Sequence, residues 1–238
     1  MTYEFTPIGR ISSLYRDKFA TPRQPGLTKA AKAQVILSPE FSSPETVREL
    51  ENFSHIWLLF LFDKNYQQGW TPTVRPPRLG GNKRVGVFAS RSPFRPNPIG
   101  LSPVRLLAVN IEEGNVVLDV QGADLINGTP ILDIKPYIAY SDAIPDAKSG
   151  FAQTAPDLLP VEFSPTAQQE LAGFAQHSPQ LEELISETLA LDPRPAYQRE
   201  SDDAREYGAL LDRYNIRWKI VEGRVQVLTV AVAEPANN

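Results

Sequence analysis

Asp133, Lys135 and Tyr137 alternate along the stretch ILDIKPY and could carry proton-transfer chemistry. In an extended segment every second side chain points to the same side, so these three groups would share one face. A carboxylate, an ammonium group and a phenol in one row can move a proton or bind a ligand. The row could equally be a surface ion pair of Asp133 with Lys135 that contributes little to stability. The three residues are candidate catalytic residues, and both interpretations stay open.

The stretch FASRSPFRPNPIG, from Phe88 to Gly100, is a second candidate site. Its prolines fix the backbone and would hold Arg91 and Arg95 in place at low entropic cost. A rigid loop with arginines and no acid suits the recognition of phosphate or carboxylate groups. The alternative is a proline-rich corner of a barrel with solvated arginines. Phe94, between the arginines, could stack on a base, but a role as a core anchor is the favoured interpretation.

The positive charge of the chain is concentrated around this loop. The 48 residues from Lys64 to Ile111 contain eight Lys or Arg and no Asp or Glu, whereas the whole chain of 238 residues has a net charge of −4, so the remaining residues carry −12. Such segregation favours a polyanionic partner, because the local potential governs the encounter. The alternative is that these cations pair with acids from elsewhere in the fold.

Several classes of chemistry have no support in the sequence. The absence of cysteine excludes disulfides, thiolate zinc sites and a cysteine nucleophile. No dinucleotide-binding glycine motif, P-loop, zinc-protease motif or serine-hydrolase motif occurs. Of the two histidines, His55 is expected to be a hydrogen-bonded core residue and His177 a structural residue at the end of a helix. We therefore expect no metal site.

The start of the chain lacks the features of a signal peptide, and the longest apolar run, Ile56 to Phe62, is too short to cross a bilayer. These two observations predict a soluble, cytoplasmic protein without a membrane partner.

Short strands must position the residues named above. The runs AQVILS, HIWLLFLF, RVGVFAS, VRLLAVNI, NVVLDVQG and GTPILDIKPYI predict strands within residues 1–145, with HIWLLFLF buried on both faces. In the last run Ile131 is expected on the same face as Asp133 and Lys135. The stretch SPETVRELENF predicts one short helix capped by Ser43. Six or more strands with one helix favour a mainly β fold and a small closed barrel.

The character of the chain changes after this barrel. Residues 146–160 are rich in proline and acid and predict a linker or arm, and residues 161–238 predict a smaller α+β domain. Within that domain one helical stripe is predicted, formed by Leu181, Leu184, Ile185, Thr188 and Leu189. A hairpin is expected to turn at Glu222-Gly223. Arg194 and Tyr197 in DPRPAY are fixed by prolines, which suggests recognition, although a helix stop followed by a linker explains them nearly as well.

Five stretches, taken in order, resemble the TsaA-like (TrmO) family. They are FATPRQPGL, TPTVRPPRLGGN, GVFASRSPFRPNPIGLS, NGTPILDIKPY and DPRPAY. The resemblance covers nearly the whole chain and implies a non-Rossmann, TsaA-like β-barrel that forms a homodimer. It further implies an S-adenosylmethionine-dependent tRNA methyltransferase that binds its cofactor near the subunit interface. The substrate would be N6 of N6-threonylcarbamoyladenosine at position 37, beside the anticodon of threonine tRNA.

The resemblance also implies which residues contact the cofactor. Matched to the family's motifs, they are Pro25, Gly26, Leu27, Asp63, Lys64, Arg91, Leu101, Asp124, Leu125, Ile126 and Asn127. One position departs from the family pattern, because Asn127 stands where the family has an aspartate. Asparagine keeps the acceptor oxygen and the turn but loses the charge, so it can contact the cofactor but is a doubtful base.

Methyl transfer from a sulfonium needs in-line geometry and a nucleophile that loses its proton. A ureido nitrogen is a weak nucleophile, so we expect Asp133 or Tyr137 to remove that proton, while Arg95 and Lys135 hold the threonyl carboxylate or phosphates. The anticodon stem-loop is expected to bind through Arg75, Arg78, Lys83, Arg84, Arg95, Asn97, Arg194 and Tyr197. Two alternatives stay open: methylation of another nucleoside or small molecule, and a non-catalytic RNA-binding barrel.

Overall fold

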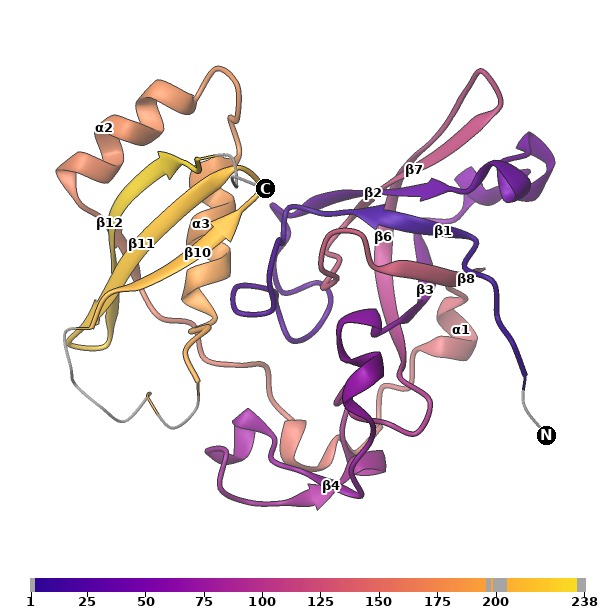
Figure 1. Cartoon of the computed structure of the whole chain (residues 1–238), viewed down its shortest axis with the longest axis horizontal. Coiled ribbons are helices and arrows are strands. Elements are labelled where there is room, and N and C mark those ends of the chain that lie inside the picture. Colours follow the sequence, from indigo (N-terminus) through magenta and orange to yellow (C-terminus); the bar gives the residue numbers. More distant parts are fainter. Residues whose placement is uncertain (1–2, 196–197, 199–204, 235–238) are drawn as a thin grey trace.

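A computed structural model describes residues 3–195, 198 and 205–234 of the chain. It contains a closed barrel of antiparallel strands and, beside it, a separate sheet covered by helices (Figure 1). The barrel order is β1-β2-β7-β6-β3-β8, which closes because β1 pairs with both β2 and β8. The prediction of a mainly β protein with a closed barrel and a C-terminal α+β unit is confirmed.

The barrel strands and the small elements attached to them lie within residues 9–142. The barrel is formed by β1 (Gly9–Ser12), β2 (Lys32–Leu37), β3 (His55–Leu61), β6 (Ile99–Glu112), β7 (Asn115–Gln121) and β8 (Pro130–Pro136). Between β3 and β6 the chain forms a two-stranded sheet of β4 (Thr73–Val74) and β5 (Val85–Gly86). The short helix α1 (Ala139–Asp142) follows β8.

The second unit is an antiparallel three-stranded meander with one parallel strand at its edge. Its elements are β9 (Val161–Phe163), α2 (Pro165–Phe174), α3 (Leu181–Ala190), β10 (Tyr207–Leu211), β11 (Tyr214–Val221) and β12 (Arg224–Val232). The five predicted stripe residues of α3 are all buried, and Glu222 and Gly223 both have positive φ, as a tight hairpin turn requires. Both of these predictions are confirmed.

The barrel interior is filled by alternate residues of its strands. On β3 these are Ile56, Leu58 and Phe60, whereas Trp57 and Leu59 on the opposite face are half-buried. The prediction that this strand is buried on both faces is therefore wrong for its outer face. The reason is the architecture, because a barrel strand turns only one face to the core.

Three local predictions need correction. The expected helix after Ser43 is two separate 3₁₀ turns, Pro44–Val47 and Leu50–Asn52, because Glu49 between them adopts a left-handed conformation with φ 68°. The cap itself is confirmed, since the Ser43 side chain accepts a hydrogen bond from the Glu45 N–H. The run RVGVFAS contains only the two strand residues of β5, followed by a 3₁₀ turn over Val87–Ala89.

The third correction concerns the faces of β8. The pairing of β8 with β3 shifts register between Leu59 and Phe60, which face Asp133 and Ile131 respectively. Strand β8 carries one extra residue here, Leu132, which shifts the alternation by one position. Ile131 is therefore fully buried in the barrel core, where Ile134 also packs. Ile131 therefore does not share the face of Asp133 and Lys135.

Candidate functional site

The predicted catalytic row lies on the outer face of the barrel. Strand β3 is the centre of this face, because it pairs with β6 on one side and β8 on the other. Directly opposed residues in a sheet point to the same side, so each row across the three strands forms a continuous strip. The three strips, read from β6 through β3 to β8, are Leu101–Leu59–Asp133, Pro103–Trp57–Lys135 and Arg105–His55–Tyr137.

This register brings predicted cofactor and catalytic residues together. Leu101 and Asp133 are separated by one strand, which places their backbones about 10 Å apart at ordinary strand spacing. The Leu101 side chain is 50% exposed, so it offers apolar surface to a ligand at the edge of this face. A methyl donor held at Leu101 and an acceptor held at Asp133 would lie within reach of each other.

The Asp133 carboxylate is held by two contacts. One oxygen accepts the backbone N–H of Ile134 at 2.8 Å, and the other lies 2.9 Å from the Lys135 ammonium group. Both side chains remain substantially exposed, at 45% and 62%. An oriented and accessible carboxylate beside a cation can accept a proton from a bound ligand. Asp133 and Lys135 also form the surface ion pair that was the alternative interpretation of this sequence pattern.

Aromatic rings support the end of this row. The Tyr137 ring centre lies 5.6 Å from Trp57 and 6.2 Å from His55, and its backbone N–H donates to the His55 carbonyl. The Trp57 indole N–H donates to the Asp142 carboxylate at 2.9 Å, which ties α1 to the strip. His55 is exposed, with its Nδ1 2.9 Å from the Ser54 hydroxyl, so its prediction as a core residue is wrong.

The predicted cofactor loop, Pro25 to Leu27, crosses a turn of the barrel at close range. The Gly26 N–H donates to the Gly122 carbonyl at 2.8 Å, and a Cβ placed on Gly122 would lie 3.2 Å from the Gly26 Cα. Gly122 also has φ of 80°, so both its conformation and its surroundings favour glycine. Beside the loop, Arg91 donates to the Gln24 side-chain oxygen at 2.6 Å.

Asp124 is the carboxyl group near this loop whose pKa is raised by its surroundings. Desolvation raises the pKa of its carboxyl group to about 6, although a hydrogen bond from Ser102 and the nearby charge of Arg91 oppose the rise. The Ser102 hydroxyl donates to Asp124 at 2.6 Å. A carboxyl group poised near neutral pH is typical of functional sites. Asp124 can therefore receive a cation or a hydroxyl donor at small electrostatic cost.

The remaining predicted cofactor residues have varied surroundings. Leu125 is buried at 2% exposure and supports the turn from the core side. The Asn127 amide oxygen accepts the Ser13 N–H at 3.0 Å, and Gly128 supplies the positive φ that this turn needs. Ile126 is half-buried, and its carbonyl closes the turn by accepting the backbone N–H of residue 129. Asp63 and Lys64 form an ion pair at 3.7 Å where β3 ends.

The basic segment keeps most of its charge unpaired. Within the part of the chain that the structure describes, Lys64 is the only one of its eight cations that forms an ion pair. The alternative, in which acids from elsewhere neutralise this segment, is supported among these residues only for Arg91, whose charge acts on Asp124. Arg75, Arg78, Lys83, Arg84 and Asn97 are exposed. Two of them also bond within the fold: Arg78 donates to the Thr154 carbonyl and Arg84 to the Thr73 hydroxyl.

Two predicted RNA-binding arginines have structural partners. Arg95 donates to the carbonyls of Val87 and Ser90 at 3.2 and 2.6 Å, so it organises its own loop, and it lies against the exposed ring of Phe88. Arg194 is 6% exposed and pairs with Asp192 at 2.9 Å, so its guanidinium group is not presented to solvent. We do not retain Arg194 on the basic surface. Tyr197 lies outside the described residues.

Sequence reasoning missed three residues of this site: Gln24, Trp57 and Ser102. Each contacts a predicted residue that is far away along the chain, so no local pattern could identify it. Among the described residues there is no cluster of three or more His, Asp or Glu that could hold a metal ion. Likewise, no helix in the described part is long and apolar enough to span a bilayer.

Comparison with known proteins places the whole chain in one family. Residues 10–143 match the family model described as tRNA-methyltransferase O N-terminal domain, and residues 156–233 match the TrmO C-terminal domain. The chain is 44% identical over 230 residues to the tRNA (adenine(37)-N6)-methyltransferase of Escherichia coli, covering 96% of this chain and 98% of that protein. It is 46% identical over 219 residues to a putative S-adenosylmethionine-dependent methyltransferase of Pseudomonas aeruginosa, covering 92% and 93%.

A solved structure leads to the same family. The crystal structure of TrmO from Pseudomonas aeruginosa superposes with a TM-score of 0.81 at 39% sequence identity, covering 97% of this chain and 99% of that one. The similarity thus covers the barrel as well as the C-terminal sheet. The chain belongs to the TrmO family.

Proposed function

We propose that this chain is an S-adenosylmethionine-dependent tRNA methyltransferase that modifies N6 of N6-threonylcarbamoyladenosine at position 37. The observation that carries the proposal is the outer face of the barrel, where Asp133, Lys135 and Tyr137 lie in strips with Leu101 and Arg105 of the basic segment. Membership of the TrmO family supports the reaction, since the Escherichia coli relative is named tRNA (adenine(37)-N6)-methyltransferase.

The residues around the loop fit S-adenosylmethionine in chemical terms. This cofactor combines an apolar adenine ring, ribose hydroxyls, a sulfonium and an amino-acid group. Exposed apolar Leu101 can pack on the ring, the backbone of Gly26 can approach closely, and the Asp124 carboxyl group can accept from hydroxyl or ammonium groups. Arg91 can pair with a carboxylate. When bound, the cofactor supplies an electrophilic methyl group.

The row on β8 prepares the nucleophile. The N6 atom of the modified adenosine belongs to a ureido group, so it is a weak nucleophile as long as it carries its proton. We infer that Asp133 accepts this proton, because its carboxylate is oriented by the Ile134 N–H and is exposed. Lys135 pairs with that carboxylate and binds the threonyl carboxylate, and the Tyr137 ring positions the substrate against Trp57.

The basic segment binds the anticodon stem-loop through its phosphates. Exposed Arg75, Arg78, Lys83, Arg84 and Asn97 supply the contacts, while Arg95 shapes the loop that presents them. Because such binding releases counterions, the affinity falls steeply as salt concentration rises. Position 37 lies in a single-stranded loop, so little base pairing has to be broken to reach N6. The C-terminal domain, residues 161–238, contributes further tRNA contacts.

We further propose that the chain acts as a cytoplasmic homodimer. Exposed apolar residues near the site support a second subunit, since Leu101 is 50% and Phe88 is 77% exposed.

Nucleoside mass spectrometry of tRNA from a strain lacking the gene tests the proposal. The methylated form of threonylcarbamoyladenosine should disappear and return when the gene is restored. If the methylated nucleoside persists in the deletion strain, the substrate is a different nucleoside or a small molecule. Calorimetric titration with S-adenosylmethionine separates both enzyme functions from a non-catalytic RNA-binding barrel, which would release no heat.

A further inference from the structure

Residues 13–31, between β1 and β2, connect the two units of the molecule. In Figure 1 this segment loops out of the barrel toward the C-terminal sheet and returns. It includes the predicted cofactor loop Pro25 to Leu27, so one continuous stretch reaches both the C-terminal domain and the site. The following contacts show how firmly each end of this stretch is held.

The first half of the segment packs into the core of the C-terminal domain. Tyr15 is 1% exposed within that core, where it forms a β-bridge with Leu211. Phe19 stacks on Trp218 and Tyr207, with ring centres 5.8 and 6.3 Å away. These rings belong to β10 and β11, so the segment is an integral part of the C-terminal core.

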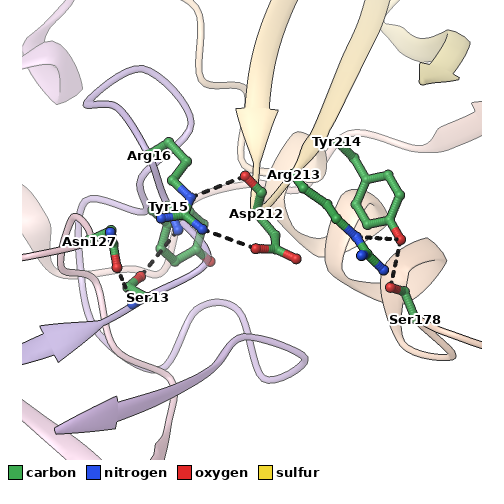
Figure 2. A network of polar contacts seen from close by, with 8 residues as sticks. All are labelled: Ser13, Tyr15, Arg16, Asn127, Ser178, Asp212, Arg213 and Tyr214. Atoms are coloured by element: carbon green, nitrogen blue, oxygen red, sulfur yellow. Dashed lines mark hydrogen bonds and ion pairs between the residues drawn. The ribbon is translucent and has the colours of Figure 1, made fainter. Parts of the chain in front are cut away.

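Polar contacts fix the segment further. Arg16 donates to both the carbonyl and the carboxylate of Asp212, at 3.1 and 3.2 Å, as Figure 2 shows. The backbone N–H of Ala30 donates to the Glu187 carboxylate of α3 at 2.7 Å. Ala30 is 5% exposed, so this N–H has little access to water and depends on Glu187 for its hydrogen bond.

The same segment touches the barrel site. Gln24 accepts from Arg91, and Gly26 donates to Gly122. At the far end, the Gly122 N–H donates to the Ala31 carbonyl at 3.0 Å, one residue beyond the Glu187 contact. Gly122 therefore forms backbone hydrogen bonds with the segment at both Gly26 and Ala31. A shift of residues 30 and 31 would move Gly122 and, through it, the cofactor loop at Gly26.

We propose that the C-terminal domain positions the cofactor loop, with Glu187 of α3 as the positioning residue that fixes its exit through the Ala30 N–H. The inference rests on the proposed binding of S-adenosylmethionine at this loop. It gives the C-terminal domain a role on the cofactor side in addition to any contact with tRNA. Glu187 does not touch the reacting atoms and acts only through the loop.

The physical reason is preorganisation. A loop that is already ordered loses less conformational freedom when its ligand binds, so the ligand binds more tightly. Without Glu187 the buried Ala30 N–H lacks a partner, and the loop exit favours arrangements in which that group reaches water. Cofactor affinity should therefore fall, whereas the register of β8 with β3, which sets the catalytic row, is unaffected.

Calorimetry with S-adenosylmethionine alone, on the full-length chain, tests the inference. Glu187→Ala should raise the dissociation constant about tenfold. Glu187→Gln keeps an acceptor oxygen and should recover most of that loss. The matched control is Glu183→Ala, an exposed glutamate on the same helix, which should bind like the unmodified chain. In turnover, Glu187→Ala should raise KM for the cofactor and leave kcat within about twofold at saturation.

Equal dissociation constants in Glu187→Ala and the unmodified chain would overturn the inference. The inference would also be overturned if Glu187→Ala lowered kcat as much as it weakened cofactor binding and Glu187→Gln restored neither. That combination would indicate a general disturbance of the fold. If Glu187→Ala does not fold, Glu187→Asp decides instead: its shorter side chain withdraws the carboxylate from the Ala30 N–H, so it should raise the dissociation constant relative to Glu183→Asp, and equal constants in these two variants would overturn the inference. Failure of the unmodified chain to bind the cofactor would instead overturn the proposed function.

Discussion

The catalytic row and the cofactor loop are held in different ways. Asp133, Lys135 and Tyr137 are placed by the pairing of β8 with β3, so backbone hydrogen bonds of the sheet set their spacing. The loop around Gly26 has no strand partner and is held by single contacts to Arg91, Gly122 and the C-terminal domain. The row is therefore sensitive to changes of side-chain chemistry, and the loop to changes of local geometry.

The largest effect should come from removing the Asp133 carboxylate. Asp133→Ala should lower turnover by about 10²–10⁴-fold, because a positioned acid or base typically contributes that much. The side chain is 45% exposed and lies outside the core, so stability and cofactor affinity should change little. Methyl transfer to tRNA at saturating cofactor measures the first quantity and calorimetry the second. Unchanged turnover in both Asp133→Ala and Tyr137→Phe would exclude the row as the proton acceptor.

The next largest effect should come from disturbing the loop through Gly122. Gly122→Ala places a Cβ 3.2 Å from the Gly26 Cα in a backbone with φ of 80°, so the loop must shift. Cofactor affinity should fall by about tenfold or more, while urea unfolding should show a loss of about 1–3 kcal/mol.

The matched control for Gly122→Ala is Gly114→Ala. Gly114 has φ of 81° with nothing within 4 Å of the added Cβ, so it carries the same backbone strain without the contact. Gly114→Ala should lower the free energy of unfolding but leave the affinity for the cofactor unchanged. A similar loss of affinity in both variants would show that strain alone, and not the approach to the loop, governs binding.

Asp124 should make cofactor binding depend on pH. Its pKa is raised to about 6 by desolvation, whereas an unfolded chain has it near 3.8. Binding of a cation favours the carboxylate, so affinity should rise as pH increases from 5 to about 7.5 and then level off. Asp124→Asn should bind more weakly at pH 7.5 and show a flat profile in calorimetry. A sloping profile in that variant would assign the titration to another group.

The same shift predicts a change in stability of the ligand-free chain. A raised pKa means that the folded state binds the proton more tightly, so this stabilisation is fully present below about pH 4 and is lost as pH rises through about 6. Above pH 7 Asp124→Asn should be more stable than the unmodified chain, by about 3 kcal/mol. Urea unfolding at pH 4 and pH 8 measures the difference, which should be small at the lower pH.

The smallest effects should come from single cations of the basic segment. Arg75→Ala and Lys83→Ala should each weaken tRNA binding a few-fold and lower the slope of log affinity against log salt by about one. Lys32→Ala, an exposed lysine of β2 outside the segment, serves as the control. Equal losses for Lys32 and Arg75 would indicate that the RNA does not select the basic segment.

Local regularity decided which parts of the fold could be predicted. Alternation in β8 correctly grouped Asp133 with Lys135, and helical spacing correctly gave the buried stripe of α3, because both periods are properties of the backbone. Ile131 was misplaced because the irregularity beside it arises in the pairing with β3 and leaves no trace in the local sequence. The left-handed Glu49, which divides the expected helix, was equally invisible.

Distance along the chain limited the prediction of the site. The motifs identified Asp124, Arg91 and Gly26, but their partners Ser102, Gln24 and Gly122 are between 22 and 96 residues away. Glu187 is further still, 157 residues from Ala30. Such contacts depend on barrel closure and on docking of the C-terminal sheet, and neither is encoded in a short pattern. The burial of Arg194 against Asp192, only two residues away, was missed for a different reason, since a proline-fixed backbone position does not reveal which way the side chain points.

The most direct test of the central claim is methyl transfer to two matched anticodon stem-loops, one with N6-threonylcarbamoyladenosine at position 37 and one with unmodified adenosine. With S-adenosylmethionine present, mass spectrometry of the digested nucleosides should show one added methyl group on the modified base, and none with Asp133→Ala. Equal methylation of both stem-loops, or of neither, would contradict the proposed substrate and the role of the outer-face row.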